Sequence, residues 1–175
     1  MENQANGLGK VNKKLTSVEK ATSTILNNIP VLSSYEEIVL NSLGKTLAKP
    51  VTALLSNPPS DVSSMDGYAL KNSDIDNGVL EFTVIDESVA GKSSSKTVAT
   101  MQTVRIFTGA KIPHGADRVI LQEDIKRLGN NLIKINKNKL ENNNFFIRKT
   151  GMDFKLGEKL IDKGEILNTR NISLC

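Results

Sequence analysis

The sequence predicts an α+β protein rich in β-structure, in which a β-rich middle is inserted between two ends that contain helix. Residues 79–148 consist of short runs of β-branched and aromatic residues separated by turn-forming residues. Apolar residues near the start recur at helical spacing. A Pro-rich segment at 57–61 and an Asn-rich segment at 136–144 are placed where an inserted domain would begin and end. We therefore assign residues 1–55 and 147–175 to one mixed domain and residues 56–146 to the insertion.

The amino-terminal end is predicted to hold one helix. Residues 1–14 are polar and rich in Asn and Lys, so we expect them to be disordered. Thr16 and Glu19 have the spacing of a capping box, with Thr16 as the N-cap. Apolar residues then follow at helical spacing, which predicts a helix over residues 17–27.

Residues 34–48 allow two interpretations. The polar residues 33–37 could begin a second helix, whereas residues 38–40 could form a short strand. In the second case Asn41 would cap a single helical turn that Gly44 ends. The β-branched residues and the early glycine favour the strand followed by a turn.

The rest of the chain is predicted to form short strands joined by turns. Pro50 lacks a backbone N–H, so the strand containing it is expected at a sheet edge. Gly129 marks a hairpin turn, and residues 91–96 an exposed loop. Asn168 is predicted to cap a helix over residues 169–174, and because the chain stops there we expect a fragment of a longer protein. The expected strands are 47–55, 79–85, 103–107, 118–122, 124–128, 132–135 and 145–148.

Composition narrows the possible partners. The 175 residues carry a formal net charge of +4, yet Lys and Arg are scattered, which argues against a nucleic-acid partner and fits an anionic small substrate. The one cysteine, Cys175, excludes an internal disulfide. No signal peptide and no apolar run of membrane-spanning length is present, so the cytoplasm is the expected location.

Two short stretches are candidates for chemistry. Asp66-Gly67 follows the rigid segment 57–61, and a glycine there would let the backbone approach a ligand, although a plain turn between two strands is the commoner meaning of this dipeptide. Thr108-Gly109-Ala110 follows a predicted strand and offers a hydroxyl and backbone amides to an oxyanion. A strand-terminating turn is again the more frequent interpretation.

Three further groups are weaker candidates. Glu123, after a predicted strand, could join Asp66 around a divalent cation, although a solvated strand end is favoured. Arg148 and Lys149 could form a positive wall beside an anionic substrate, with Asp153 orienting a cation or hydroxyl, and the alternative is a surface turn. The sequence has a single histidine, so zinc lacks ligands.

Three stretches of the chain, in order and spacing, resemble the signature motifs of the molybdopterin molybdenumtransferases, the MoeA/gephyrin family. The resemblance covers the chain from about residue 40 to its end, and the second stretch is the most specific. The first stretch is Pro58, Asp61, Ser63 and Met65–Ala69; the second is Val104–Pro113, Gly115–Asp117, Val119-Ile120 and Gln122-Glu123; the third is Phe146–Arg148, Gly151, Asp153, Gly157 and Gly164.

The resemblance implies an elongated mixed domain with an inserted β-barrel-like domain, and a homodimer. It also implies insertion of molybdenum from molybdate into adenylylated molybdopterin, with Mg²⁺ and release of AMP, after an upstream molybdopterin adenylyltransferase. The molybdopterin-binding and C-terminal domains would be absent from this chain, so we expect the fragment alone to be inactive. The alternative is a non-catalytic dimerisation or scaffolding module of the same family.

The resemblance also implies functional roles for individual residues. Asp66, Thr108 and Asp153 match functional positions, and we expect Asp66 to position Mg²⁺ or a water at the adenylyl phosphate. Thr108 with the two following amides would hold an oxyanion, and the cations after residue 147 would attract the pterin phosphate. The expected substrate-binding residues are Ser63, Gly67, Gly109, Ala110, Arg148 and Lys149, and Glu123 is a second possible metal ligand. The chain departs from the family pattern at Val62, Ser64 and Met152, which puts ligand detail in question.

Overall fold

The computed structural model describes residues 15–140 and 144–175, and the chain divides into one unit ending at Glu37 and a second from Ile38 to Cys175. The prediction of disorder for residues 1–14 lies outside the described residues. Within the described ranges, strands outnumber helices and no helix is long and apolar enough to cross a membrane.

The first unit contains the predicted helix, α1 (Val18–Asn28). Its N-cap is Ser17, whose hydroxyl accepts a hydrogen bond from the Lys20 backbone N–H at 3.3 Å, so the assignment of Thr16 as N-cap is wrong by one residue. The helix ends at Ile29, whose extended backbone suits the position before Pro30.

The prediction of a strand over residues 38–40 is wrong. The chain forms a 3₁₀ turn, η1 (Val39–Asn41), closed by hydrogen bonds from the Asn41 and Ser42 amides to the carbonyls of Ile38 and Val39. Within the described chain this segment has no neighbouring strand to pair with, so local turn bonds satisfy its backbone. The turn ends at Ser42, and Gly44, which was predicted to end it, lies two residues further on with a φ of +78°.

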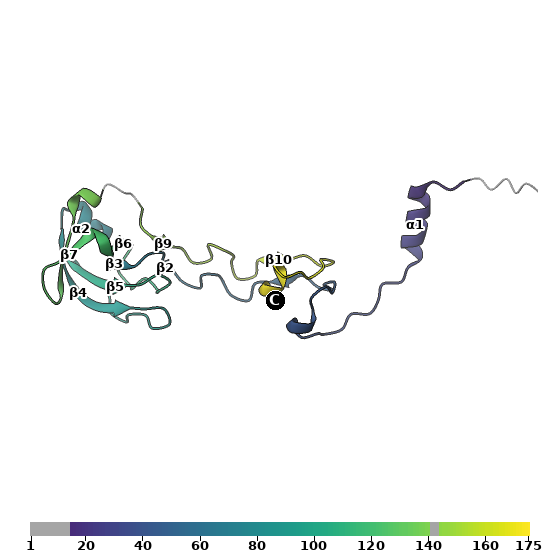
Figure 1. Cartoon of the computed structure of the whole chain (residues 1–175), viewed down its shortest axis with the longest axis horizontal. Coiled ribbons are helices and arrows are strands. Elements are labelled where there is room, and N and C mark those ends of the chain that lie inside the picture. Colours follow the sequence, from purple (N-terminus) through teal and green to yellow (C-terminus); the bar gives the residue numbers. More distant parts are fainter. Residues whose placement is uncertain (1–14, 141–143) are drawn as a thin grey trace, which may run out of the picture. The chain divides into compact units, whose positions relative to one another are not determined.

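The residues before and after the β-rich middle run side by side. Strand β1 (Val51–Thr52) pairs antiparallel with β10 (Lys159–Ile161), and Figure 1 shows the two segments together. The predicted strand 47–55 is thus only two residues long. Isolated bridges continue the pairing at Thr46–Ile166 and Asn57–Phe154. The proposed boundaries of the two domains stay a prediction.

A six-stranded sheet forms the middle of the chain (Figure 1). Its strands lie in the order β6-β3-β5-β4-β8-β7. Every neighbouring pair is antiparallel except β4 and β5. The sheet curls into a half-barrel, which confirms the β-rich α+β fold class, and β7 and β8 form the predicted hairpin. The strands are β3 (Gly67–Leu70), β4 (Glu81–Ser88), β5 (Gln102–Ile106), β6 (Arg118–Leu121), β7 (Ile125–Arg127) and β8 (Leu132–Ile135). A separate pair joins β2 (Val62–Ser63) to β9 (Ile147–Arg148).

Both faces of the sheet are covered by apolar side chains, and β3 contributes to each because its side chains alternate. Tyr68 and Leu70 belong to a cluster on one face that includes Phe82, whereas Ala69 belongs to a second cluster with Ile106. All four residues of β3 are buried. The strand that follows Asp66 is therefore held on both sides.

The short helices were predicted least well. Helix α2 (Asn72–Asp76) was not predicted, because its sequence is polar and resembles a turn. Its buried Asp74 accepts a hydrogen bond from the distant Met101 amide at 2.9 Å. The predicted carboxy-terminal helix is the 3₁₀ turn η4 (Asn171–Leu174), whose N-cap is Arg170 rather than the predicted Asn168. Asn168 does accept hydrogen bonds from the backbone amides of Arg170 and Asn171. The remaining 3₁₀ turns are η2 (Gln122–Asp124) and η3 (Lys137–Lys139).

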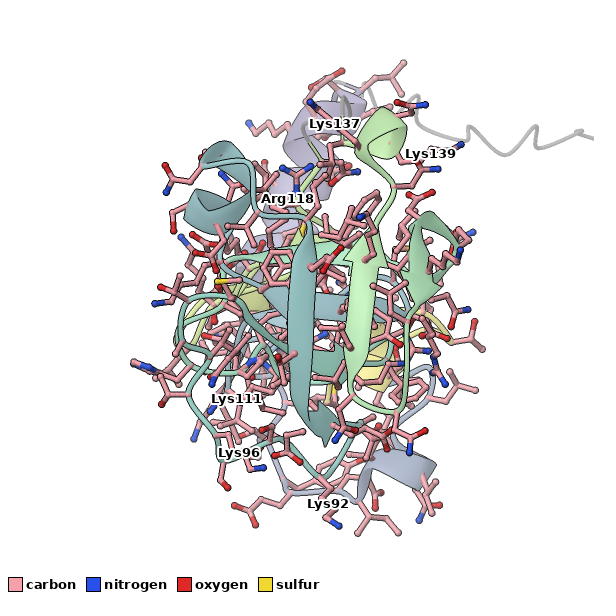
Figure 2. All side chains as sticks on the ribbon, turned by 90° about the vertical axis from the view of Figure 1, so that its left-hand side faces the viewer. Lys92, Lys96, Lys111, Arg118, Lys137 and Lys139 are labelled. Atoms are coloured by element: carbon pink, nitrogen blue, oxygen red, sulfur yellow. The ribbon has the colours of Figure 1, made fainter. Side chains whose placement is uncertain are left out.

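Six of the cationic side chains of the β-rich middle are labelled in Figure 2. Figure 2 shows Lys92, Lys96 and Lys111 at the lower end of the view. Lys137 and Lys139 lie at the upper end, near Arg118. These six labelled side chains therefore lie in two groups in this view.

Candidate functional site

Asp66 and Thr108 are in direct contact. Strand β3 pairs antiparallel with β5, with Gly67 opposite Ile106, so the residue before β3 lies beside the residues that follow β5. The Asp66 Oδ1 atom accepts two hydrogen bonds from Thr108, one from its backbone N–H and one from its hydroxyl, both at 2.8 Å. The carboxylate and the hydroxyl named from the sequence therefore share one surface.

These contacts fix the charge and the direction of the Asp66 carboxylate. The Thr108 backbone N–H, then its hydroxyl, and then the positive charge of Arg105 lower the pKa of Asp66 below its ordinary value. Its other oxygen, Oδ2, has no hydrogen-bond donor among the residues that the structure describes. The arrangement gives an oriented, ionised carboxylate with one open oxygen.

The turn that carries Asp66 is built by buried Ser63. The Ser63 hydroxyl donates to the Met65 carbonyl at 2.6 Å and accepts from the Met65 amide at 3.3 Å. At the other end of the turn, the Gln122 amide donates to the Asp66 carbonyl at 3.1 Å. Ser63 is only 1% exposed and supports the turn, and its expected role in binding substrate stays a prediction.

The amides after Thr108 already have acceptors. The Gly109 N–H donates to the Ser63 carbonyl at 2.8 Å, and the Ala110 N–H donates to the Phe107 carbonyl at 2.9 Å. Thr108 itself donates to Asp66. An oxyanion bound by these three groups would have to displace existing hydrogen bonds. In this structure the amides of Gly109 and Ala110 shape the turn, and their expected contact with an oxyanion stays a prediction.

Gly67 is required by the packing of the sheet, and its expected contact with substrate stays a prediction. It is not among the glycines with a positive φ, so backbone conformation is not what demands a glycine here. A Cβ atom at this position would lie 2.0 Å from the Ile120 carbonyl oxygen on β6. The absence of a side chain is what allows β3 to approach β6.

The charged residues of the third motif pair with one another and with the first motif. Arg148 makes hydrogen bonds of 2.6 and 2.8 Å to both carboxylate oxygens of Asp153, which also accepts one from Asn57. Lys149 forms an ion pair with Asp61 at 2.8 Å. Between this group and the Asp66–Thr108 pair, the described chain contains no hydrogen bond or ion pair, so the structure leaves them as two separate clusters.

Asp61 is the acceptor at the centre of the second cluster. Lys149 donates to its Oδ2, and the backbone and hydroxyl of Thr150 donate to its Oδ1 at 2.9 and 3.1 Å. The hydrogen bond from Lys149, followed by that from the Thr150 amide, lowers the pKa of Asp61. Much of the positive charge expected from Lys149 is thus balanced locally.

The part of the chain that the structure describes does not by itself build a complete metal site. Among residues 15–140 and 144–175, no three His, Cys, Asp or Glu side chains come together. Glu123 lies exposed in η2. Because Mg²⁺ is commonly held by one or two carboxylates together with substrate phosphates, the open oxygen of Asp66 fits a partial site.

Arg105 was not predicted as a site residue. Its guanidinium group lies 5.0 Å from the centre of the Tyr68 ring and 4.6 Å from that of Phe107. It also borders a cavity of about 390 Å³ together with Arg127. The sequence did contain a signal, because a cation on a strand with an aromatic residue two positions later shares a face with that ring.

Comparisons with known proteins agree with the motifs. Residues 16–175 match the family model described as the MoeA N-terminal region (domain I and II). The chain is 31% identical over 168 residues to a molybdopterin molybdenumtransferase of Nostoc sp., and 32% identical over 161 residues to one of Staphylococcus aureus strain Mu50. These alignments cover 91% and 90% of this chain and 38% of each relative, so the chain spans less than half of their length.

Solved structures give the same result. A molybdopterin biosynthesis MoeA protein from Pyrococcus horikoshii OT3 aligns with a TM-score of 0.78 and 31% identity. That alignment covers 92% of this chain and 43% of the other. A second MoeA structure, described as from Pyrococcus horikosii, gives a TM-score of 0.77 at 28% identity, over 92% of this chain and 41% of the other.

Proposed function

Because the chain belongs to the MoeA N-terminal family, we propose that it is the N-terminal region of a molybdopterin molybdenumtransferase. The complete enzyme would insert molybdenum from molybdate into adenylylated molybdopterin and release AMP. Its substrate would come from a molybdopterin adenylyltransferase. The observation that carries the proposal is the ionised Asp66 carboxylate, held through one oxygen by Thr108 and open at the other.

The proposed role of Asp66 follows from this geometry. A carboxylate that is fixed at Oδ1 can accept a hydrogen bond at Oδ2 from a water and orient it toward the adenylyl phosphate. Magnesium, when bound, would balance negative charge on that phosphate, and Asp66 Oδ2 is the atom of this chain that would hold it. Thr108 acts on the carboxylate, fixing its direction, rather than directly on an oxyanion.

The second cluster is proposed as a substrate contact. Arg148 is half exposed on its side chain, and its pairing with Asp153 holds the planar guanidinium in one orientation. Such a group suits a phosphate ligand, which accepts two parallel hydrogen bonds from arginine. In this proposal Asp153 orients Arg148 for the pterin phosphate, and Lys149 contributes a more distant positive charge.

This chain alone is expected not to insert molybdenum, because the relatives it matches are more than twice its length and the remaining domains would supply the rest of the cleft. The experiment compares the 175-residue chain with a full-length enzyme that carries it, each given adenylylated molybdopterin, molybdate and Mg²⁺. We expect AMP release and molybdenum insertion only from the full-length enzyme. Turnover by the short chain would refute the expectation, and no turnover by either would refute the proposed function.

We also propose that the complete enzyme is a homodimer in which α1 contacts the partner. None of the residues of α1 is buried, and Val18, Ile25 and Leu26 are 76%, 57% and 66% exposed. Apolar side chains gathered on one helix face are typical of an interface. This exposed surface also supports the alternative function, a dimerisation or scaffolding module. Molybdenum insertion by the full-length enzyme would show that dimerisation or scaffolding is not the protein's sole role.

The dimer proposal predicts that Ile25→Glu converts the full-length enzyme from dimer to monomer, because a charge would be buried in the apolar contact. Sedimentation velocity measures the change. The matched control is Ser23→Glu, which adds the same charge on the polar side of α1 and should leave a dimer. A dimer that persists in Ile25→Glu would place the interface elsewhere.

A further inference from the structure

Arg105 lies where three elements of the β-rich middle meet. Its guanidinium donates one hydrogen bond to the Gly67 carbonyl at 2.9 Å and another to the Gln122 side-chain carbonyl at 2.6 Å. The rings of Tyr68 and Phe107 lie near the same group, at 5.0 and 4.6 Å. Two directed hydrogen bonds and two aromatic neighbours leave the guanidinium little freedom to rotate.

Three of these four contacts are made with residues that adjoin Asp66 or Thr108 in the chain or are hydrogen-bonded to the Asp66 turn. Gly67 directly follows Asp66 in the chain, and Phe107 directly precedes Thr108. Gln122 is bonded to the same turn, since its amide donates to the Asp66 carbonyl at 3.1 Å. Arg105 thus connects the backbone on the Asp66 side of the pair with the backbone on the Thr108 side.

We propose that Arg105 is a positioning residue that holds Asp66 and Thr108 in register with each other. Asp66 stands in a turn before β3 and Thr108 in a turn after β5, so neither position is fixed by the ladder of backbone hydrogen bonds alone. Arg105, from within β5, fixes the Gly67 carbonyl and Gln122 together. The two hydrogen bonds from Thr108 then hold the Asp66 carboxylate in one orientation.

Lysine could not replace arginine in this role. A lysine ammonium keeps the charge, but it is a compact group on a flexible stem and lacks the planar fork that reaches two acceptors while stacking on rings. Arg105→Lys therefore separates the positioning role from a purely electrostatic one. Arg127→Lys is the matched control, because Arg127 lies on the same sheet, borders the same cavity, and makes no contact with the pair.

The first arm of the test needs no enzyme activity. Hydrogen exchange of the Thr108 amide, measured by NMR on this chain, reports the hydrogen bond to Asp66. We expect exchange to become about tenfold faster in Arg105→Lys and in Arg105→Met, and to be unchanged in Arg127→Lys. The buried Val104 amide within β5 should keep its protection, which separates loss of positioning from general destabilisation.

The second arm rests on the proposed function and uses the full-length enzyme. A displaced carboxylate should lower kcat for molybdenum insertion by about 10²-fold and change KM little, because misplacement affects the reacting geometry. Unchanged Thr108 exchange in both Arg105 variants would overturn the positioning role. Faster exchange with unchanged insertion would retain that role and instead contradict the proposed function of Asp66.

Discussion

Gly67→Ala is expected to unfold the β-rich middle or leave it barely stable. An added Cβ would lie 2.0 Å from the Ile120 carbonyl oxygen and 3.0 Å from the Val119 side chain, and both neighbours belong to β6. The oxygen is backbone that pairs with β3, so it cannot move aside without separating the two strands. We expect the free energy of unfolding to fall by more than about 3 kcal/mol, measured by urea unfolding followed by circular dichroism.

Gly129→Ala is the matched control for this prediction. Gly129 lies in the hairpin turn between β7 and β8, has no positive φ, and has no atom within 4 Å of the position of an added Cβ. The same chemical change there should alter stability by less than about 0.5 kcal/mol. If Gly67→Ala proved as stable as Gly129→Ala, the close approach of β3 to β6 would be wrong.

The elements that could be predicted from sequence were those with strong local signals. The β-branched residues of β5 and the glycine in the β7–β8 turn were sufficient for these strands, and the helical spacing of apolar residues was sufficient for α1, although its cap was assigned one residue too early. Helix α2 was missed because what stabilises it is not local: buried Asp74 accepts a hydrogen bond from Met101 on a different part of the chain. The turn η1 was taken for a strand because its β-branched residues are compatible with either state.

In the candidate site, too, some features could be predicted from the sequence and others could not. Asp66 and Thr108 could be named from their residue types and from the family motifs, and the pairing of β3 with β5 brings them into contact. The hydrogen-bond acceptors of the Gly109 and Ala110 amides could not be predicted. The Gly109 amide donates to the Ser63 carbonyl, which belongs to another strand. Arg105 was overlooked because three of its four contacts, those with Gly67, Gln122 and Tyr68, are made with distant parts of the chain that only the folded sheet brings together.

Asp66→Asn in the full-length enzyme is expected to lower the rate of molybdenum insertion by about 10²-fold or more while leaving the fold intact. Asparagine has nearly the same shape, and its Oδ1 can still accept both hydrogen bonds from Thr108. It loses the negative charge, and with it the ability to hold Mg²⁺ or to attract a proton from water. The β-sheet circular dichroism and the oligomeric state should be those of the unaltered enzyme.

Asp86→Asn is the matched control, because Asp86 is also an aspartate of the β-rich middle that accepts a hydrogen bond from a hydroxyl, that of Ser94 at 2.6 Å. The deciding measurement is AMP release in a single turnover by these two variants, with adenylylated molybdopterin prebound and molybdate and Mg²⁺ added. We predict that Asp66→Asn releases AMP at least about 10²-fold more slowly and that Asp86→Asn matches the unaltered enzyme. Equal rates for both variants would show that the Asp66 carboxylate takes no part in the reaction.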